Sequence, residues 1–174
     1  VTNMRTIPIP PPGRLSRGEL IADYLAGDGR CADPALCDPT DFSPFNLITA
    51  DANGAHFLSN TNQQHALSAG IYGLSNGTLD EPWPKTVRLR DALRDWLAGS
   101  ADDPGQLFIA LADGSLPSEG ASPHEAIFIR NSVYGTRCST VVAIDDAGEG
   151  MIIERRFDAN GDDAGETEIA FRWP

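Results

Sequence analysis

Lysine is nearly missing from this sequence, since Lys85 is the only one among 174 residues. Acidic residues number 25 against 13 lysines and arginines together, so the formal net charge is -12 at pH 7. A chain this acidic repels phosphates, which argues against binding to nucleic acids or to anionic membrane surfaces. No apolar run approaches the roughly 18 residues of a membrane span, and no basic-then-apolar leader is present. We therefore predict a cytoplasmic protein without membrane insertion.

Cysteine and histidine are also scarce, with three of each. An odd number of cysteines is more typical of reduced thiols than of a disulfide framework. Cys31 and Cys37 lie close together in an Asp/Pro-rich loop, with a spacing unlike that of a zinc knuckle. The histidines show no ligand spacing either. We therefore predict reduced thiols, no metal site and no cofactor.

The composition is otherwise that of a folded chain, with 41% hydrophobic and 22% charged residues. The length suits one domain with a core of its own. We predict a single domain over residues 1–174.

Hydrophobic periodicity predicts helices and strands in separate regions. The predicted strands are 1–4, 45–51, 55–60, 71–74, 126–130, 139–144, 151–157 and 168–173. The predicted helices are 20–25, 84–97 and 106–112, and a proline-rich loop covers 7–13. Ser16 and Glu19 form a capping box before the first helix, and Asn53-Gly54 marks a hairpin turn. Consecutive strands without helices between them indicate an antiparallel sheet, so the fold class is α+β.

The acidic segment 158–165 resembles a calcium-binding loop at its first positions. A calcium loop requires glycine at its sixth position and glutamate at its twelfth, where this chain has Asp163 and Ile169. We therefore interpret the segment as an acidic hairpin turn.

Asn76 follows the predicted strand 71–74 and precedes Gly77. Asn-Gly is common at turns because both residues tolerate positive φ, and position alone favours that interpretation. The alternative is that the Asn76 side-chain amide holds a substrate carbonyl or a developing oxyanion.

Arg137 lies in a polar stretch that leads directly into the apolar strand 139–144. An arginine at a strand mouth can bind an anion or polarise a carbonyl through its fixed fork of donors. The alternative, which position favours, is a solvent-facing start of a strand. Cys138 lacks a base that the sequence would place beside it, so we interpret it as a packing residue.

Seven motifs occur here in one order: VTNMR, SRGELIADYL, FNLITAD, FLSN, GIYGLSNGTLDEPWPK, YGTRCSTVV and ERRFD. Together they closely resemble the NRDE family, also called the transport and Golgi organisation protein 2 family. The resemblance implies a fold like that of the N-terminal nucleophile hydrolases, a four-layer αββα sandwich in which helices face two antiparallel sheets. In this chain we expect the N-terminal strands of that sandwich to be missing.

Family members begin with Met-Cys, and the processed cysteine would supply both a thiol nucleophile and a free α-amine as base. This sequence begins at Val1 and has neither that cysteine nor the Asn-Arg-Asp-Glu signature. The resemblance implies support roles for Asn3 and Asn76 beside the nucleophile, with Asn76 as an oxyanion donor, and for Arg137 as the site arginine. We therefore expect a fragment that is catalytically incomplete as given.

Two hypotheses follow. The first is a hydrolase-like protein that cleaves an amide or thioester bond in its complete form. The second is a non-catalytic carrier or chaperone for a hydrophobic metabolite such as haem or an acyl-CoA or lipid, although no histidine has the spacing of a haem ligand. The sequence leaves the oligomeric state open.

Overall fold

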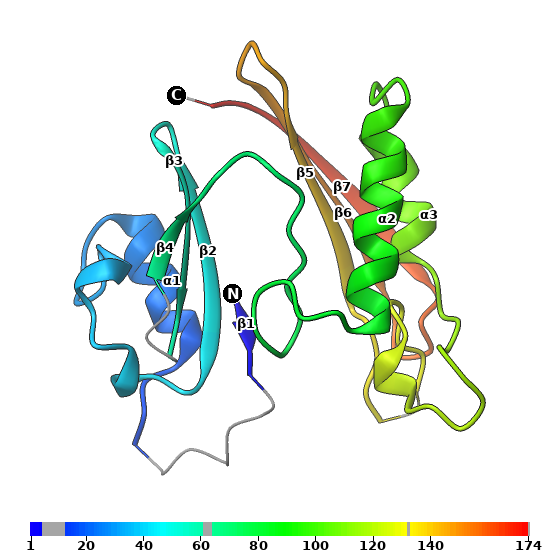
Figure 1. Cartoon of the computed structure of the whole chain (residues 1–174), viewed down its shortest axis with the longest axis horizontal. Helices are drawn as coiled ribbons and strands as arrows, with labels where there is room; N and C mark the ends of the chain where they lie inside the picture. Colours follow the sequence, from blue (N-terminus) through cyan, green and yellow to red (C-terminus); the bar gives the residue numbers. More distant parts are fainter. Residues whose placement is uncertain (5–12, 61–63, 132, 174) are drawn as a thin grey trace. The chain divides into compact units, whose positions relative to one another are not determined.

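The chain divides into two compact units, Val1–Glu81 and Pro82–Pro174, in the computed structural model (Figure 1). The structure describes residues 1–4, 13–60, 64–131 and 133–173. The predicted proline-rich loop therefore lies largely outside the described residues. Each unit contains one antiparallel sheet and helices that pack on it, which confirms the α+β class.

The first unit is built on a four-stranded antiparallel sheet in the order β1-β2-β3-β4. Its elements are β1 (Thr2–Asn3), α1 (Arg17–Ala26), the 3-10 turns Pro34–Leu36 and Pro39–Asp41, β2 (Phe45–Asp51), β3 (Gly54–Ser59) and β4 (Gln64–Leu67). The predicted hairpin is confirmed, with Asp51 opposite Gly54 at its tip. The Asp51 carboxylate accepts a hydrogen bond from the backbone N–H of Asn53 at 2.7 Å, which holds the turn.

Helix α1 begins where the capping pattern predicts. The Ser16 hydroxyl accepts a hydrogen bond from the Glu19 backbone N–H at 3.1 Å, and Gly27 ends the helix in the left-handed conformation at φ 68°. Leu20 on this helix is fully buried. It packs with the other buried core residues Cys31, Phe42, Phe45, Leu47 and Leu58.

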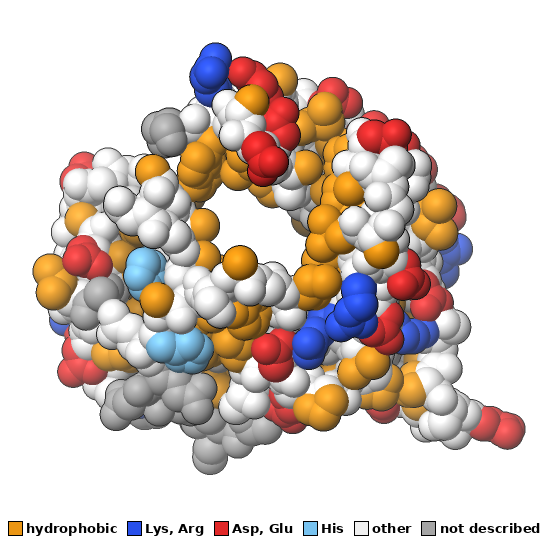
Figure 2. All heavy atoms as spheres, turned by 45° about the horizontal axis from the view of Figure 1, so that its top comes forward, with side chains coloured by type: hydrophobic (Ala, Val, Ile, Leu, Met, Phe, Trp, Pro, Cys, Tyr) orange, Lys and Arg blue, Asp and Glu red, His pale blue; other side chains and the backbone are white. Residues whose placement is uncertain are grey.

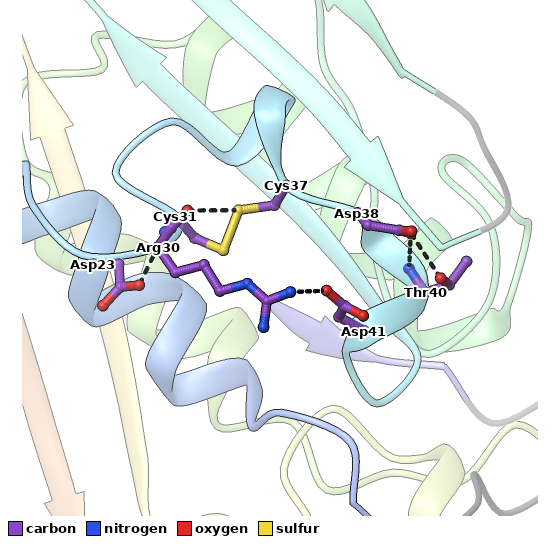
Figure 3. The surroundings of a disulfide bond; sticks show 7 residues. All are labelled: Asp23, Arg30, Cys31, Cys37, Asp38, Thr40 and Asp41. Atoms are coloured by element: carbon purple, nitrogen blue, oxygen red, sulfur yellow. Dashed lines mark hydrogen bonds and ion pairs between the residues drawn. A yellow bond between two sulfur atoms is a disulfide. The ribbon is translucent and has the colours of Figure 1, made fainter.

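Cys31 and Cys37 form a disulfide bond, so the prediction of reduced thiols is wrong for this pair (Figure 3). The 3-10 turn between them brings their Cα atoms to 5.6 Å, within the range that a disulfide bridges. Cys31 is 1% exposed and Cys37 packs against the same core. The odd cysteine is Cys138, which is exposed and free.

Residues 71–74 do not form the predicted strand. The backbone groups of Gly73 are used within a loop: its N–H donates to the Asp80 carboxylate at 2.8 Å, and its C=O accepts from the Asp80 N–H at 2.8 Å. Asp80 has φ 60°, which suits this closed turn. The run is apolar because it is partly buried, and its hydrogen bonds are local.

The second unit contains the three-stranded antiparallel sheet β5-β6-β7. Its elements are α2 (Pro84–Ala98), the 3-10 turn Pro104–Gln106, α3 (Leu107–Leu111), the 3-10 turn Pro123–Glu125, β5 (Cys138–Ile144), β6 (Glu149–Phe157) and β7 (Asp163–Arg172). Both predicted helices and the last three predicted strands are confirmed. The acidic segment after β6 is a hairpin turn as predicted, closed by the Asp158 N–H donating to the Asp162 C=O at 2.9 Å.

The predicted strand 126–130 is wrong. The Phe128 N–H donates to the Asp113 C=O at 2.9 Å, and Ile129 exchanges hydrogen bonds with Thr136, at 2.9 Å each. Ala126 and Phe128 are buried in an irregular segment. Burial therefore explains the apolar run without a sheet ladder.

One face of the β5-β6-β7 sheet is packed and the other is open. Phe108 of α3 packs on Val141 and Ile153, and the Arg155 guanidinium lies 4.1 Å from the centre of the Phe108 ring. On the opposite face Val142 and Ile169 are 58% and 53% exposed. The described part of the unit leaves this apolar face uncovered by its own helices.

Acidic side chains lie at many separate places on the face shown in Figure 2, as the negative net charge leads one to expect. Among the helices of the described ranges, none is long and apolar enough to cross a bilayer.

Candidate functional site

Asn3 and Asn76, which are far apart in the sequence, are in contact in the first unit. The Asn76 side-chain Nδ2 donates to the Asn3 backbone C=O at 3.1 Å and also to the Asn3 side-chain Oδ1. Asn3 is placed by β1, where it pairs with Phe45 of β2. Two amide side chains thus meet at the edge strand of the sheet.

The backbone conformation does not support the interpretation of Asn76 as a residue chosen for a left-handed turn. Among the described residues other than glycine, only Asp80 and Ala101 have positive φ, and Gly77 has no positive φ either. The Asn-Gly pair is therefore not needed for a left-handed turn. At Gly77, an added Cβ would meet the Glu81 carboxylate, which would have to move aside.

Asn46 is a third amide at this place, and sequence reasoning did not single it out. It is 0% exposed on β2, and its Nδ2 donates to the Gly77 C=O at 2.7 Å and to the Thr2 hydroxyl at 3.3 Å. Its Oδ1 is buried and has no hydrogen-bond partner among the described residues. The available signal was a polar residue between two apolar residues, Phe45 and Leu47.

The orientation of the Asn46 amide follows from its short bond to Gly77. Turning the amide over would place Oδ1 against the Gly77 carbonyl oxygen, and two acceptors repel each other. Two ordinary hydrogen bonds contribute about 1 kcal/mol each, and a buried acceptor without a partner costs about 1–3 kcal/mol. The unpaired oxygen therefore offsets part of what the two bonds contribute, although removing the amide would also leave the buried Gly77 C=O without its donor.

The loop that carries Asn76 has its own internal hydrogen bonds. Besides the Gly73–Asp80 pair, the Thr78 N–H donates to the Glu81 carboxylate at 2.8 Å. These bonds fix the shape of the loop. The bond from Asn46 joins that loop to β2.

Arg137 belongs to the second unit, where it precedes β5. Its Nη1 donates to the Asp158 C=O at 2.8 Å, so it holds the hairpin turn that joins β6 to β7. The Asp158 side chain also accepts backbone hydrogen bonds, first from Asp162, which lowers the pKa of its carboxyl group. The predicted role of Arg137 toward an anion or substrate stays a prediction.

Cys138 is exposed on β5 opposite Arg156, so its interpretation as a packing residue is wrong. The strand alternates, and it is the neighbouring Ser139 that is buried. No cluster of three or more His, Cys, Asp or Glu side chains suited to a metal ion occurs within residues 1–4, 13–60, 64–131 and 133–173.

The fold and site define a class: an α+β protein with two antiparallel sheets and an amide-lined site at a sheet edge. The chain belongs to the Transport and Golgi organisation 2 (TANGO2) family, whose sequence model matches residues 1–159. This confirms the family resemblance seen in the motifs.

Curated relatives agree with this assignment. The chain is 28% identical over 172 residues to the bovine Transport and Golgi organization protein 2 homolog, covering 80% of this chain and 61% of that relative. It is 24% identical over 173 residues to the mouse homolog, covering 83% and 63%, and 26% identical over 168 residues to the human homolog, covering 80% and 61%. The chain thus spans about three-fifths of the length of the curated relatives it matches.

Proposed function

We propose that the whole protein containing this chain hydrolyses an amide or thioester bond by an N-terminal cysteine nucleophile. The observation that carries the proposal is the contact between the Asn76 side-chain amide and Asn3 at the end of β1. Side-chain amides are effective oxyanion donors when they are held in place before the reaction begins. The family membership of the chain supports the same mechanism.

The proposed reaction begins when a cysteine thiolate attacks the substrate carbonyl and a tetrahedral oxyanion forms. One Nδ2 hydrogen of Asn76 would leave Asn3 and donate to that oxyanion, while the other would stay on Asn3 and orient the amide. Arg137 would bind the substrate. Collapse of the intermediate releases an amine or a thiol, and water then hydrolyses the acyl-enzyme. The proposed nucleophile and its free α-amine are not among residues 1–174, so activity is to be measured on the protein from its native source.

We also propose that residues 1–174 are part of one domain with the αββα architecture of the N-terminal nucleophile hydrolases. Each unit supports this by having one antiparallel sheet packed against helices on one face. The apolar face of β5-β6-β7 that lacks helices is the kind of surface that a second sheet covers in a sandwich.

The test begins with the protein purified from its native source, by intact mass and N-terminal sequencing. A mass above 18.6 kDa and an N-terminal cysteine are expected. Hydrolysis of an N-acyl amide and of a matched acyl thioester is then measured, and Asn76→Ala should lower kcat about 10²–10³-fold. Absence of an N-terminal cysteine would rule out this mechanism.

The exposed apolar residues of β5 and β7 favour a second candidate, a non-catalytic carrier for a hydrophobic metabolite. Val142, Ile144 and Ile169 are 58%, 43% and 53% exposed on one sheet. Such a face can bind an acyl chain or a haem ring without a specific ligand residue. Saturable binding of palmitoyl-CoA or haem, lost in Val142→Asp and unaccompanied by hydrolysis, would favour the carrier over the hydrolase.

We propose a cytoplasmic location as well, on the basis of composition. The Cys31–Cys37 disulfide is more typical of an oxidising compartment, so the location and the thiol state should be measured together. Alkylation of thiols in intact cells before lysis reports that state. A fully oxidised pair would argue against the cytoplasm.

A further inference from the structure

Asn46 contacts the neighbours of both proposed site asparagines. Its one Nδ2 group donates to the Gly77 C=O, next to Asn76, and to the Thr2 hydroxyl, next to Asn3. We propose that Asn46 is a positioning residue that holds Asn3 and Asn76 at a fixed separation. This inference rests on the proposed function of that pair.

The connection to Asn3 runs through the sheet. Thr2 lies directly opposite Asn46 in the β1–β2 register, and the Asn46 side chain adds a bond to the Thr2 hydroxyl at 3.3 Å. Asn3, the next residue of β1, pairs with Phe45 of β2. The Asn46 side chain thus adds a bond between the same two strands beside Asn3.

The connection to Asn76 runs through the backbone of the next residue. At 2.7 Å, the bond from Asn46 to the Gly77 C=O fixes the peptide that follows Asn76. The loop keeps its internal shape through bonds such as that between Gly73 and Asp80. Loss of the Asn46 amide should therefore release the loop from β2 without unfolding it.

The Asn46 amide joins two segments and leaves its buried Oδ1 without a partner among the described residues. Phe45 and Leu47 on either side are apolar and buried, and an apolar residue at position 46 would avoid that unpaired oxygen but would leave the buried Gly77 C=O without its donor. An amide at this position is useful because its N–H donors reach two segments at once. A purely structural position would not need both donors.

The test uses the 174-residue chain with Asn46→Leu and Asn46→Val. Both variants keep the approximate shape of the side chain and remove its N–H donors. Leu47→Val is the matched control, because Leu47 is the next residue of β2 and packs in the α1 core. The readout is NMR: the nuclear Overhauser contact between the Asn76 side-chain amide protons and Asn3, and the chemical shift of that amide.

We expect both Asn46 variants to lose the Asn76–Asn3 contact and to shift the Asn76 amide resonance toward that of a free amide. Their Tm should fall, because the buried Gly77 C=O loses its donor. Leu47→Val should lower Tm and keep the contact. A contact that survives in both Asn46 variants, or that Leu47→Val removes equally, would overturn the inference.

Activity of the whole protein separates this inference from the proposed function. If the pair serves in hydrolysis, Asn46→Leu should lower kcat on the N-acyl amide probe about 10²-fold, with KM little changed. If the Asn76 contact is lost and turnover is unchanged, Asn46 is still the positioning residue. That result would instead refute the role of the amide pair in hydrolysis.

Discussion

Removing the Cys31–Cys37 disulfide should destabilise the first unit by about 2.4 kcal/mol. The bond closes a short loop, with a sequence separation of 6. For a loop of about 7 residues, the chain-entropy relation gives roughly 8 cal/mol/K, or about 2.4 kcal/mol at 25 °C. Cys37→Ser is the variant of choice because Cys37 lies at the border of the core, whereas a hydroxyl at Cys31 would be buried inside it.

The contacts around the disulfide determine which parts of its loop should open when the bond is removed. The Cys31 N–H donates to the Asp23 carboxylate of α1 at 3.0 Å, and Arg30 forms an ion pair with Asp41 (Figure 3). These contacts hold the Cys31 end of the loop after the bond is lost. The Cys37 end depends more on the disulfide and should open first.

The assay must report on the first unit. All three tryptophans lie within residues 82–174, so tryptophan fluorescence reports on the second unit. Hydrogen exchange of peptides covering α1 and β2, measured with and without dithiothreitol, follows the first unit directly. A loss of about 2.4 kcal/mol corresponds to roughly a 60-fold rise in exchange for amides that open with the whole unit.

The matched control is Cys138→Ser, because Cys138 is exposed and free and its loss should change neither exchange nor Tm. For a chain of this size, the loss of the disulfide should lower Tm by about 5–10 °C. Unchanged exchange and Tm in both Cys37→Ser and the reduced wild type would refute the reasoning.

Three further outcomes are expected. Ser16→Ala should destabilise α1 by about 1 kcal/mol through loss of its N-cap, measured by urea unfolding, whereas Ser16→Asp should retain most of the stability. Arg137→Ala should speed amide exchange in the turn 158–162 and leave the first unit unchanged, because Arg137 binds the Asp158 C=O; equal exchange in that turn would contradict this. The Asp162 N–H is the chief cause that lowers the pKa of the Asp158 carboxyl group from its ordinary value of 3.8. The ionised carboxylate therefore contributes stability above pH 3.8, and this contribution is lost as the pH falls through the pKa of the folded state. Asp158→Asn should therefore lose less stability between about pH 5 and pH 2 than the wild type, compared by urea midpoints.

Local sequence patterns correctly predicted the elements whose ends carry capping or turn residues. The capping box predicted the start of α1, and Asn53-Gly54 predicted the tip of the β2–β3 hairpin. Short apolar runs were less informative, because burial and strand pairing give the same pattern over four or five residues. Residues 71–74 and 126–130 are apolar for burial alone, and β4 was missed because its sequence is polar and exposed.

The disulfide and Asn46 were missed for a different physical reason. The pairing of Cys31 with Cys37 depends on a turn that brings their Cα atoms together, and the number of cysteines carries no information about that distance. The partner of Asn46 lies 31 residues away in sequence, at Gly77. Contacts of this range depend on tertiary structure, which periodicity does not encode.

The three asparagines of the first unit have one property in common: local backbone structure requires none of them. Asn76 has no positive φ, Asn46 lies between two buried apolar residues of β2, and Asn3 lies on the edge strand β1. Each uses its amide in hydrogen bonds between segments distant in sequence, and among the described residues the buried Asn46 Oδ1 has no partner. An apolar residue at position 46 would remove that unpaired oxygen but would leave the buried Gly77 C=O without its donor, so stability alone does not decide between the two residue types. In the Asn46 variants, the Asn76–Asn3 contact measures the placement of the amides, and Tm measures the stability of the fold.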